Sequence, residues 1–337
     1  MVDAPGESCN TEWAMPSARE RMTAQAEPGA ASGGVCVFAP STIVTVTIEH
    51  GASDDSDGEI HFHAGGQGFW VGRMLGRLGV ATTLCTVFGG ETGVVAEALA
   101  AAEPIDVRAV HRSGENGTWI HDRRSGEREV IADVVGTSLG RHETDELVSA
   151  SLVEGLRLGR CVLTGPHGPG LIASPHYERL ARDLKGNGAE VIVDLSGEYL
   201  RSALSAGVDF AKVSDEDLTK TRGFEDLSDP VEAVRLLCDA GARHAVVTRG
   251  ELPAIASING AIAEVRVPDV AVVDHRGAGD AFTAAVAASR VWAFDWHEAI
   301  RWGAAAGSLT VIRRGLATAD RHEIHRFRER IDLHGLP

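Results

Sequence analysis

The stretch VVDHRGAGDAF at residues 272–282 is the most informative part of this sequence. A β-branched run ends in Gly-Ala-Gly at 277–279, and an alanine-rich helical pattern runs from Asp280 to about Val291. Small residues let a ligand approach the backbone closely, and the first N–H groups of a helix have no partner within it. The pattern therefore predicts an anion-binding helix N-terminus with a carboxylate beside it.

This arrangement suits phosphoryl transfer to a hydroxyl group. The Asp280 carboxylate would accept the hydroxyl proton, while the backbone N–H groups would stabilise charge on the moving phosphoryl group. An aspartate with the ordinary pKa of about 3.9 is ionised at pH 7, so we expect no shift to be needed. The alternative interpretation is that Asp280 only caps the helix and that the glycines only form a turn.

Downstream of residue 141, the pattern is that of an α/β protein. Short apolar runs at 161–164, 191–195, 210–213 and 245–248 alternate with helical stretches. Such alternation predicts βαβ units, a parallel sheet and helices on both of its faces. Ligands of these sheets bind at the carboxyl ends of the strands.

The N-terminal part divides into a tail and a β-rich segment. Residues 1–34 are rich in Ala, Gly, Ser, Pro and Glu without an apolar period, so we expect a disordered tail, and Met22 is an alternative start. Strands are expected at 35–38, 42–48 and 59–64, and residues 107–134 are expected to form a small antiparallel sheet.

Composition excludes several classes of protein. The 337 residues contain 48 acidic and 32 basic side chains, giving a formal net charge of -16, so we expect no nucleic-acid partner. No apolar run approaches the roughly 18 residues that span a bilayer, so no membrane partner is expected. Asp3 and Glu7 stand where a signal peptide would be apolar. The five scattered cysteines form no Cys-x-x-Cys pair and indicate reduced thiols in a cytoplasmic protein.

A second glycine-rich motif, GGQGFWVGRMLGRLG at 65–79, precedes the first one in the chain. The two motifs resemble the N- and C-terminal signatures of the ribokinase-like (PfkB) carbohydrate kinases, in the family's order. Segments 89–93, 194–198 and 246–250 also match, and the resemblance is closest to the 1-phosphofructokinase and tagatose-6-phosphate kinase branch.

The resemblance implies one kinase domain over about residues 35–330. Its fold is α/β: a central, mostly parallel β-sheet flanked by helices, with a small β-sheet lid formed by about 42–64 and 107–134. The phosphoryl donor of the family is normally ATP with Mg2+. A homodimer through the lid is also expected.

The resemblance assigns roles to Asp280, Gly277, Ala278, Gly279, Thr248, Gly250, Gly65, Gly66 and Gly68. The other candidates replace family residues or, like Arg276, stand beside a motif. The catalytic set is Asp280, Gly277, Ala278 and Gly279. The set at the nucleotide is Thr248, Gly250, Arg276, Ser214 and Asp217. The set at the substrate is Gly65, Gly66, Gln67, Gly68, Trp70 and Trp119.

Departures from the family pattern concentrate on the substrate side. Gln67 and Trp70 replace a Lys and an Asn, Gly117 and Trp119 replace an Arg and an Asn, and a sugar-binding Asp is missing from segment 39–43. Because phosphates need cations and sugars need polar side chains, these losses argue against a standard sugar phosphate as substrate. The two tryptophans form either an aromatic platform for the substrate or packing between lid and body.

The metal side of the site is altered as well. Ser214 and Asp217 replace an Asn and a Glu, and they either organise Mg2+ through water or form a plain acidic loop. Arg276 either contacts a phosphate or pairs with surface carboxylates. His61 and His63 alternate on one strand without a third ligand, which favours substrate contact over a metal site.

The resulting prediction is an ATP-dependent kinase that phosphorylates a small molecule bearing a hydroxyl group. A sugar-phosphate kinase of the 1-phosphofructokinase or tagatose-6-phosphate type is the alternative, with Arg73 or Arg77 as the replacement cation. A kinase homologue that binds a ligand without turnover is a further alternative. A dinucleotide-dependent oxidoreductase is disfavoured, because the Gly-x-Gly-x-x-Gly fingerprint is absent from a βαβ context.

Overall fold

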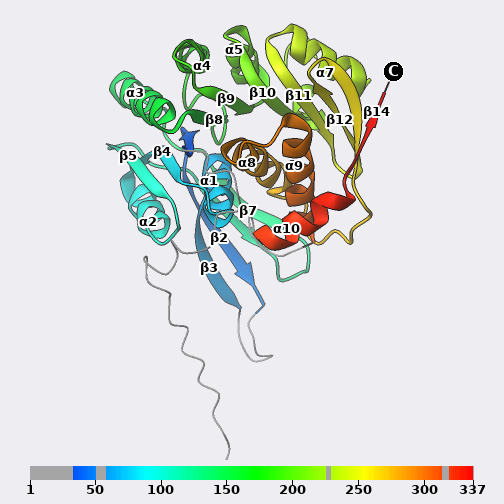
Figure 1. Ribbon diagram of the computed structural model, residues 1–337. Helices are drawn as coiled ribbons and strands as arrows, with labels where there is room; N and C mark the ends of the chain where they lie inside the picture. Colours follow the sequence, from blue (N-terminus) through cyan, green and yellow to red (C-terminus); the bar gives the residue numbers. More distant parts are fainter. Residues whose placement is uncertain (1–32, 51–57, 225–228, 313–318, 337) are drawn as a thin grey trace, which may run out of the picture.

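The computed structural model describes residues 33–50, 58–224, 229–312 and 319–336 (Figure 1). The expected N-terminal tail lies, up to residue 32, outside these described residues. The acidic loop at 51–57 lies outside them too.

A large sheet forms the centre of the molecule, with the strand order β14-β13-β12-β11-β10-β9-β8-β1-β4-β5. The seven strands from β11 to β5 run parallel, and β12, β13 and β14 continue the sheet in antiparallel pairing. The strands are β1 (Val35–Ala39), β4 (Thr82–Gly89), β5 (Asp106–Arg112), β8 (Arg160–Thr164), β9 (Glu190–Asp194), β10 (Val208–Ser214), β11 (Ala242–Arg249), β12 (Leu252–Ile258), β13 (Ala261–Arg266) and β14 (Asp332–Gly335).

Helices cover both faces of this sheet, as the alternation of strands and helices predicts (Figure 1). Along β1, Val35 and Val37 enter one apolar core, while Cys36 and Phe38 enter the other, because successive strand residues point to opposite faces. All four of these side chains are fully buried.

The helices fall into two groups according to these two cores. The first core is packed by α1 (Gln67–Arg77), α2 (Gly90–Ala100), α8 (Ala278–Val291), α9 (Trp296–Val311) and α10 (Arg321–Phe327). The second core is packed by α3 (Arg141–Leu158), α4 (Pro175–Gly186), α5 (Gly197–Ser205), α6 (Asp215–Leu218) and α7 (Pro230–Asp239). A short 3-10 helix, η2 (Arg328–Arg330), follows α10.

A second sheet of four strands, which we call the lid, projects below the body in Figure 1. Its order is β3-β2-β6-β7, with β2 (Ile43–Glu49), β3 (Glu59–Gly65), β6 (Thr118–Asp122) and β7 (Glu129–Val134). Its polar face, with Thr45 and Trp119 as register partners, is turned toward the loop before α8.

The expected boundaries of the lid were partly wrong. Residues 106–112 form β5, which pairs in parallel with β4 at the edge of the large sheet. Val107 and Ala109 pack on the first core while Val110 enters the second, so this strand is covered on both faces. The lid is also not purely antiparallel, since β2 and β6 run parallel.

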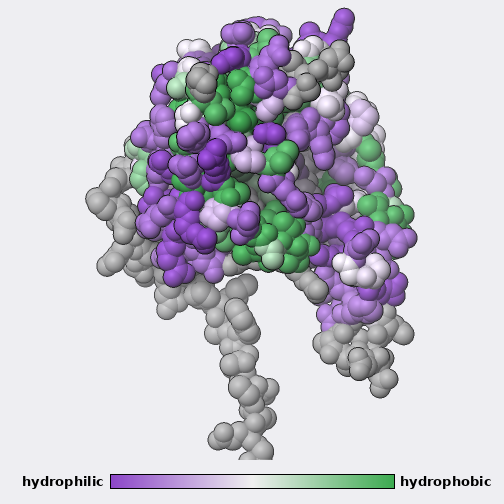
Figure 2. All heavy atoms as spheres, turned by 90° about the vertical axis from the view of Figure 1, so that its right-hand side faces the viewer, coloured by the Kyte–Doolittle hydropathy of each residue, from purple (hydrophilic) through white to green (hydrophobic). Residues whose placement is uncertain are grey.

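The opposite edge of the large sheet ends at β14. Figure 2 shows the face that carries this strand, where hydrophilic side chains prevail and apolar ones form smaller patches. Polar surroundings of this kind protect an edge strand from pairing with another chain. None of the helices in the described part of the chain is long and apolar enough to cross a membrane.

Candidate active site

The turn before α8 has the predicted form of an anion-binding helix N-terminus. Gly277 is the N-cap residue with φ 76°, a left-handed conformation that favours glycine. The first N–H groups of α8 therefore face outward without partners in the helix.

Asp280 lies in the first turn of α8, and its side chain is almost completely buried. Burial, together with the nearby Asp194 carboxylate, raises the pKa of Asp280 to about 7, although Lys212 acts in the opposite direction. The expectation of an ordinary pKa was therefore wrong, because the sequence does not show that tertiary packing removes this carboxylate from water. A carboxylate with a pKa near neutrality is well suited to accept a proton at physiological pH.

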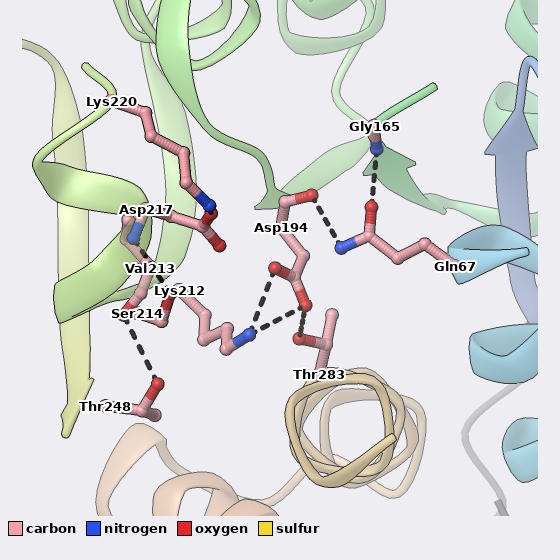
Figure 3. Close-up of polar contacts among 10 residues, drawn as sticks. All are labelled: Gln67, Gly165, Asp194, Lys212, Val213, Ser214, Asp217, Lys220, Thr248 and Thr283. Carbon is pink, nitrogen blue, oxygen red and sulfur yellow. Dashed lines mark hydrogen bonds and ion pairs between the residues drawn. The ribbon is translucent and has the colours of Figure 1, made fainter. Parts of the chain in front are cut away.

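A buried network of polar side chains joins β9, β10 and α8 (Figure 3), and two of its members, Asp194 and Lys212, act on the charge of Asp280. The Lys212 ammonium reaches from β10 to both carboxylate oxygens of Asp194, at 3.2 and 3.3 Å. The Thr283 hydroxyl of α8 donates to Asp194 Oδ2 at 2.7 Å. Burial disfavours the charged form of Lys212, but Asp194 and Asp280 outweigh it and raise the pKa of Lys212, so the ammonium stays protonated.

Gly279 permits this lysine to reach the start of α8. A Cβ atom at position 279 would stand only 2.4 Å from Lys212 Nζ. The third residue of the Gly-Ala-Gly turn is therefore small because a cation lies against it, in addition to any ligand contact of its backbone.

Lys212 was missed in the sequence. It stands inside the apolar run 210–213, which indicates only a buried strand. The available signal was the residue type itself, because a lysine is almost never buried unless it is paired.

The residues predicted at the nucleotide gather at the carboxyl ends of β10 and β11. Ser214 and Thr248 are register partners there, and the Thr248 hydroxyl donates weakly to the carbonyl of Val213 at 3.4 Å. Gly250 follows in the exposed turn to β12, with φ 58°.

Asp217 lies on α6, just after β10. Ser214 caps this short helix by accepting a hydrogen bond from the Asp217 N–H at 3.1 Å. Burial raises the pKa of Asp217, but the ion pair with Lys220 at 2.8 Å and the Ser214 hydroxyl outweigh it, so the pKa is lowered and Asp217 is ionised. A cavity of about 620 Å³ opens beside this carboxylate and is also lined by Asp194, Ser196 and Tyr199.

The glycine-rich turn before α1 packs tightly against neighbouring strands. Gly66 caps α1 with φ 101°, and a Cβ at Gly68 would stand 2.4 Å from the Ala39 Cβ. A Cβ at Gly65 would stand 2.3 Å from the Thr45 hydroxyl oxygen. Larger residues at these positions would push the lid and β1 away from the turn.

Gln67 binds the backbone of two strand ends (Figure 3). Its side-chain amide donates to the Asp194 carbonyl at 3.2 Å and accepts from the Gly165 N–H at 2.7 Å. In this structure the side chain that replaces the family's lysine therefore joins β8 to β9.

The two tryptophans lie together at the base of the lid, with ring centroids 6.5 Å apart. Trp119 is 3% exposed, whereas Trp70 is partly exposed. The guanidinium group of Arg276 lies over the Trp119 ring at 4.3 Å. The structure therefore brings Arg276 and both tryptophans to one place, between the lid and the loop before α8.

The remaining candidates are placed differently. His61 and His63 stack at 6.3 Å on the polar face of the lid, and no group of three metal-ligating side chains occurs in the described ranges. Arg73 is buried and pairs with Glu103 at 2.8 Å. Arg73 is therefore already neutralised, and the idea that it replaces the lost substrate cation is not supported.

An α/β body with a β lid, a buried carboxylate at a helix N-terminus and an adjacent buried lysine defines a phosphotransferase that acts on a hydroxyl group. The model of the pfkB family of carbohydrate kinases matches residues 35–323, and the chain belongs to this family. The fold is the ribokinase-like fold that the sequence predicts.

Curated relatives and solved structures agree with this family. The chain is 28% identical over 279 residues to the ATP-dependent 6-phosphofructokinase isozyme 2 of Mycobacterium tuberculosis, covering 81% of each protein. It is 26% identical to the 1-phosphofructokinase of Bacillus subtilis, covering 77% of this chain and 84% of that protein. The structure of Escherichia coli phosphofructokinase-2 in complex with potassium superposes with a TM-score of 0.77 at 23% identity. The superposition covers 88% of this chain and 98% of that one.

Proposed function

We propose that this chain transfers the γ-phosphoryl group of MgATP to a hydroxyl group of a small acceptor, with Asp280 as the general base. The observation that carries the proposal is the position of Asp280, buried in the first turn of α8 beside the Lys212–Asp194 pair. Relatives at 26–28% identity are named as phosphofructokinases. Two of these relatives are named ATP-dependent 6-phosphofructokinase isozyme 2, and the third is named 1-phosphofructokinase.

The proposed mechanism assigns a separate task to each part of the site. Asp280 accepts the hydroxyl proton as the acceptor oxygen attacks phosphorus. The N–H groups at Gly277, Ala278 and Gly279 hold the negative oxygens of the phosphoryl group. The Lys212 ammonium offsets the negative charge of the phosphoryl group as it moves from ATP to the acceptor. The lid keeps water away from the reacting atoms.

The residues at α6 fit a magnesium ion bound with the nucleotide. Asp217 is ionised and faces a cavity, and Mg2+ prefers carboxylate oxygens together with several waters. Asp217 would hold the ion through water, and Thr248 and Gly250 would meet the phosphates. When bound, the ion neutralises charge on the phosphates.

A sugar-phosphate acceptor is the second candidate, because several relatives are named as kinases of such compounds. Both candidates are tested by ADP formation from ATP and Mg2+ with sugars, sugar phosphates, sugar acids, nucleosides and aromatic alcohols. We expect turnover with at least one acceptor and none after Mg2+ is removed by chelation. Tight ATP binding without turnover on any acceptor would contradict the proposal and favour a ligand-binding homologue.

We also propose a homodimer through the outer face of the lid. Ile60, Phe62 and Val134 expose 59, 54 and 54% of their surface there, which is unusual for large apolar side chains. Phe62→Glu is expected to convert a dimer to a monomer in light scattering after size exclusion, whereas Leu252→Glu, at an exposed site of β12, is not. A monomeric wild-type protein at micromolar concentration would rule this interface out.

A further inference from the structure

Two arginine side chains and the backbone of a third arginine meet one carboxylate where the lid meets the loop before α8. Arg128 and Arg123, from the lid, approach Asp274 Oδ2 at 2.6 and 3.5 Å. The backbone N–H of Arg276 donates to the other oxygen of Asp274 at 3.1 Å. A second carboxylate, Glu49, reaches only Arg123, at 3.8 Å. The Arg276 guanidinium lies with that of Arg128 over the Trp119 ring, so three cations stand against these two carboxylates.

Two nitrogen donors of Arg128 are left unpaired by the residues that the structure describes. Its Nη2 donates to Asp274, but its Nε and Nη1 are buried and have no partner among the described residues. Burial lowers the pKa of Arg128 even though Asp274 opposes this effect. Because buried donors without acceptors are costly, an anion at this position would be favourable.

An indole ring and two further buried polar atoms complete the cluster. The guanidinium groups of Arg128 and Arg276 lie over the Trp119 ring at 5.0 and 4.3 Å. Stacking on an aromatic ring leaves the edge of a guanidinium free for an oxyacid. On the same face of the lid, His121 Nδ1 and Thr45 Oγ1 are buried and have no hydrogen-bond partner in the described part of the chain, at residues that are 1% and 3% exposed.

We propose that the acceptor carries an acidic oxygen group, a carboxylate or a phosphate, which Arg128 and Arg276 bind beside Trp119. The inference rests on the proposed function, because it assigns the acceptor of the same site. Arg276 directly precedes Gly277, the cap of α8, so the bound group lies close to the turn that meets the phosphoryl group. A neutral polyol would leave the buried donors of Arg128 without a charged partner.

This recognition differs from the pattern in the family's signatures. The family's Lys and Arg positions are Gln67 and Gly117 here, and Gln67 is bonded to backbone groups. In this chain the cations come instead from the hairpin between β6 and β7 and from the loop before α8. Planar guanidinium groups bind both carboxylates and phosphates through paired hydrogen bonds.

The test is calorimetric titration of the whole protein with two matched pairs of compounds, in the presence of Mg2+ and a non-hydrolysable ATP analogue. One pair is D-gluconate and D-glucitol, and the other is D-fructose 6-phosphate and D-fructose. We expect the acid of at least one pair to bind at least about tenfold more tightly than its neutral partner. Which acid prevails decides between carboxylate and phosphate.

The variants separate recognition from a purely structural contact. Arg276→Gln changes an exposed side chain, and it should weaken binding of the acid by about 10- to 100-fold while binding of the neutral partner stays the same. Arg128→Gln should act in the same way, with folding checked by circular dichroism. The control is Arg124→Gln in the same hairpin, because Arg124 pairs only with Asp122 among the contacts described.

Three outcomes would overturn the inference. They are equal affinities within both pairs, no binding of either acid up to about 10 mM, or equal weakening of acid and neutral compound in Arg276→Gln. The last result would show that the arginines only fasten the lid. Because binding is measured without turnover, Asp280→Asn should still bind the acid. Acid binding without phosphoryl transfer by the wild type would contradict only the proposed function.

Discussion

Asp280→Asn is expected to lower kcat by roughly two to four powers of ten while the fold is retained, because general base catalysis contributes on this scale. The amide has nearly the same shape as the carboxylate but cannot accept the hydroxyl proton. The measurement is ADP formation with the best acceptor, and Asp183→Asn, at a partly exposed aspartate of α4, is the matched control. Turnover near the wild-type level would remove Asp280 from the role of base.

The same substitution should stabilise the protein at alkaline pH. Burial raises the pKa of Asp280 from 3.8 to about 7. Between pH 3.8 and about 7 the folded state keeps the Asp280 proton while the unfolded state loses it. The free energy of unfolding therefore falls as the pH rises through this range, and the full loss is reached above about pH 7. Asp280→Asn should raise the free energy of unfolding at pH 8 by roughly 2–4 kcal/mol. Near pH 4 the two proteins should melt alike.

The raised pKa also sets the direction of the pH–rate profile. Since the ionised carboxylate is the active form, kcat/KM should fall as pH decreases through about 7. An ordinary aspartate would instead keep activity down to about pH 4. A profile without any change between pH 5 and 8 would show that Asp280 is not the buried base described here.

Lys212→Met is expected to lower kcat by roughly 100- to 1000-fold, the usual cost of removing one charged contact to a transition state. The methionine keeps the length of the side chain but removes the ammonium that lies against Gly279. Because Lys212 opposes the rise in the pKa of Asp280, its loss should also move the midpoint of the pH–rate profile above 7. A midpoint equal to that of the wild type would contradict the electrostatic coupling between Lys212 and Asp280.

The same variant should be unstable, because it leaves the Asp194 carboxylate buried without its cation. Breaking a buried ion pair from one side costs about 3–5 kcal/mol. Adding Asp194→Asn should restore much of the stability but not the turnover. Lys185→Met is the matched control, since it breaks the ion pair with Asp209 at the opposite end of β10. A Lys212→Met protein with normal kcat would contradict the proposed role of the lysine.

Local patterns were sufficient to predict most of the framework. The glycine turn and the alanine-rich run fixed the start of α8 near Asp280, and short apolar runs located β8, β9, β10 and β11. These signals are strong because each depends on neighbouring residues only. The strands β12 and β13 were not predicted, although they follow β11 as adjacent antiparallel strands. β5 was assigned to the wrong sheet, because its pairing with β4 across α2 leaves little trace in a single segment.

The amino-acid sequence by itself determined the family, the ribokinase-like fold and the chemical class of the reaction, because two motifs with a clear backbone requirement carry them. Only the tertiary structure decided the electrostatics of the site. Burial raises the pKa of Asp280, strand order brings Lys212 against α8, and closure of the lid places Arg128 beside Arg276. These residues are far apart in the chain, and charge and solvation depend on neighbours in space.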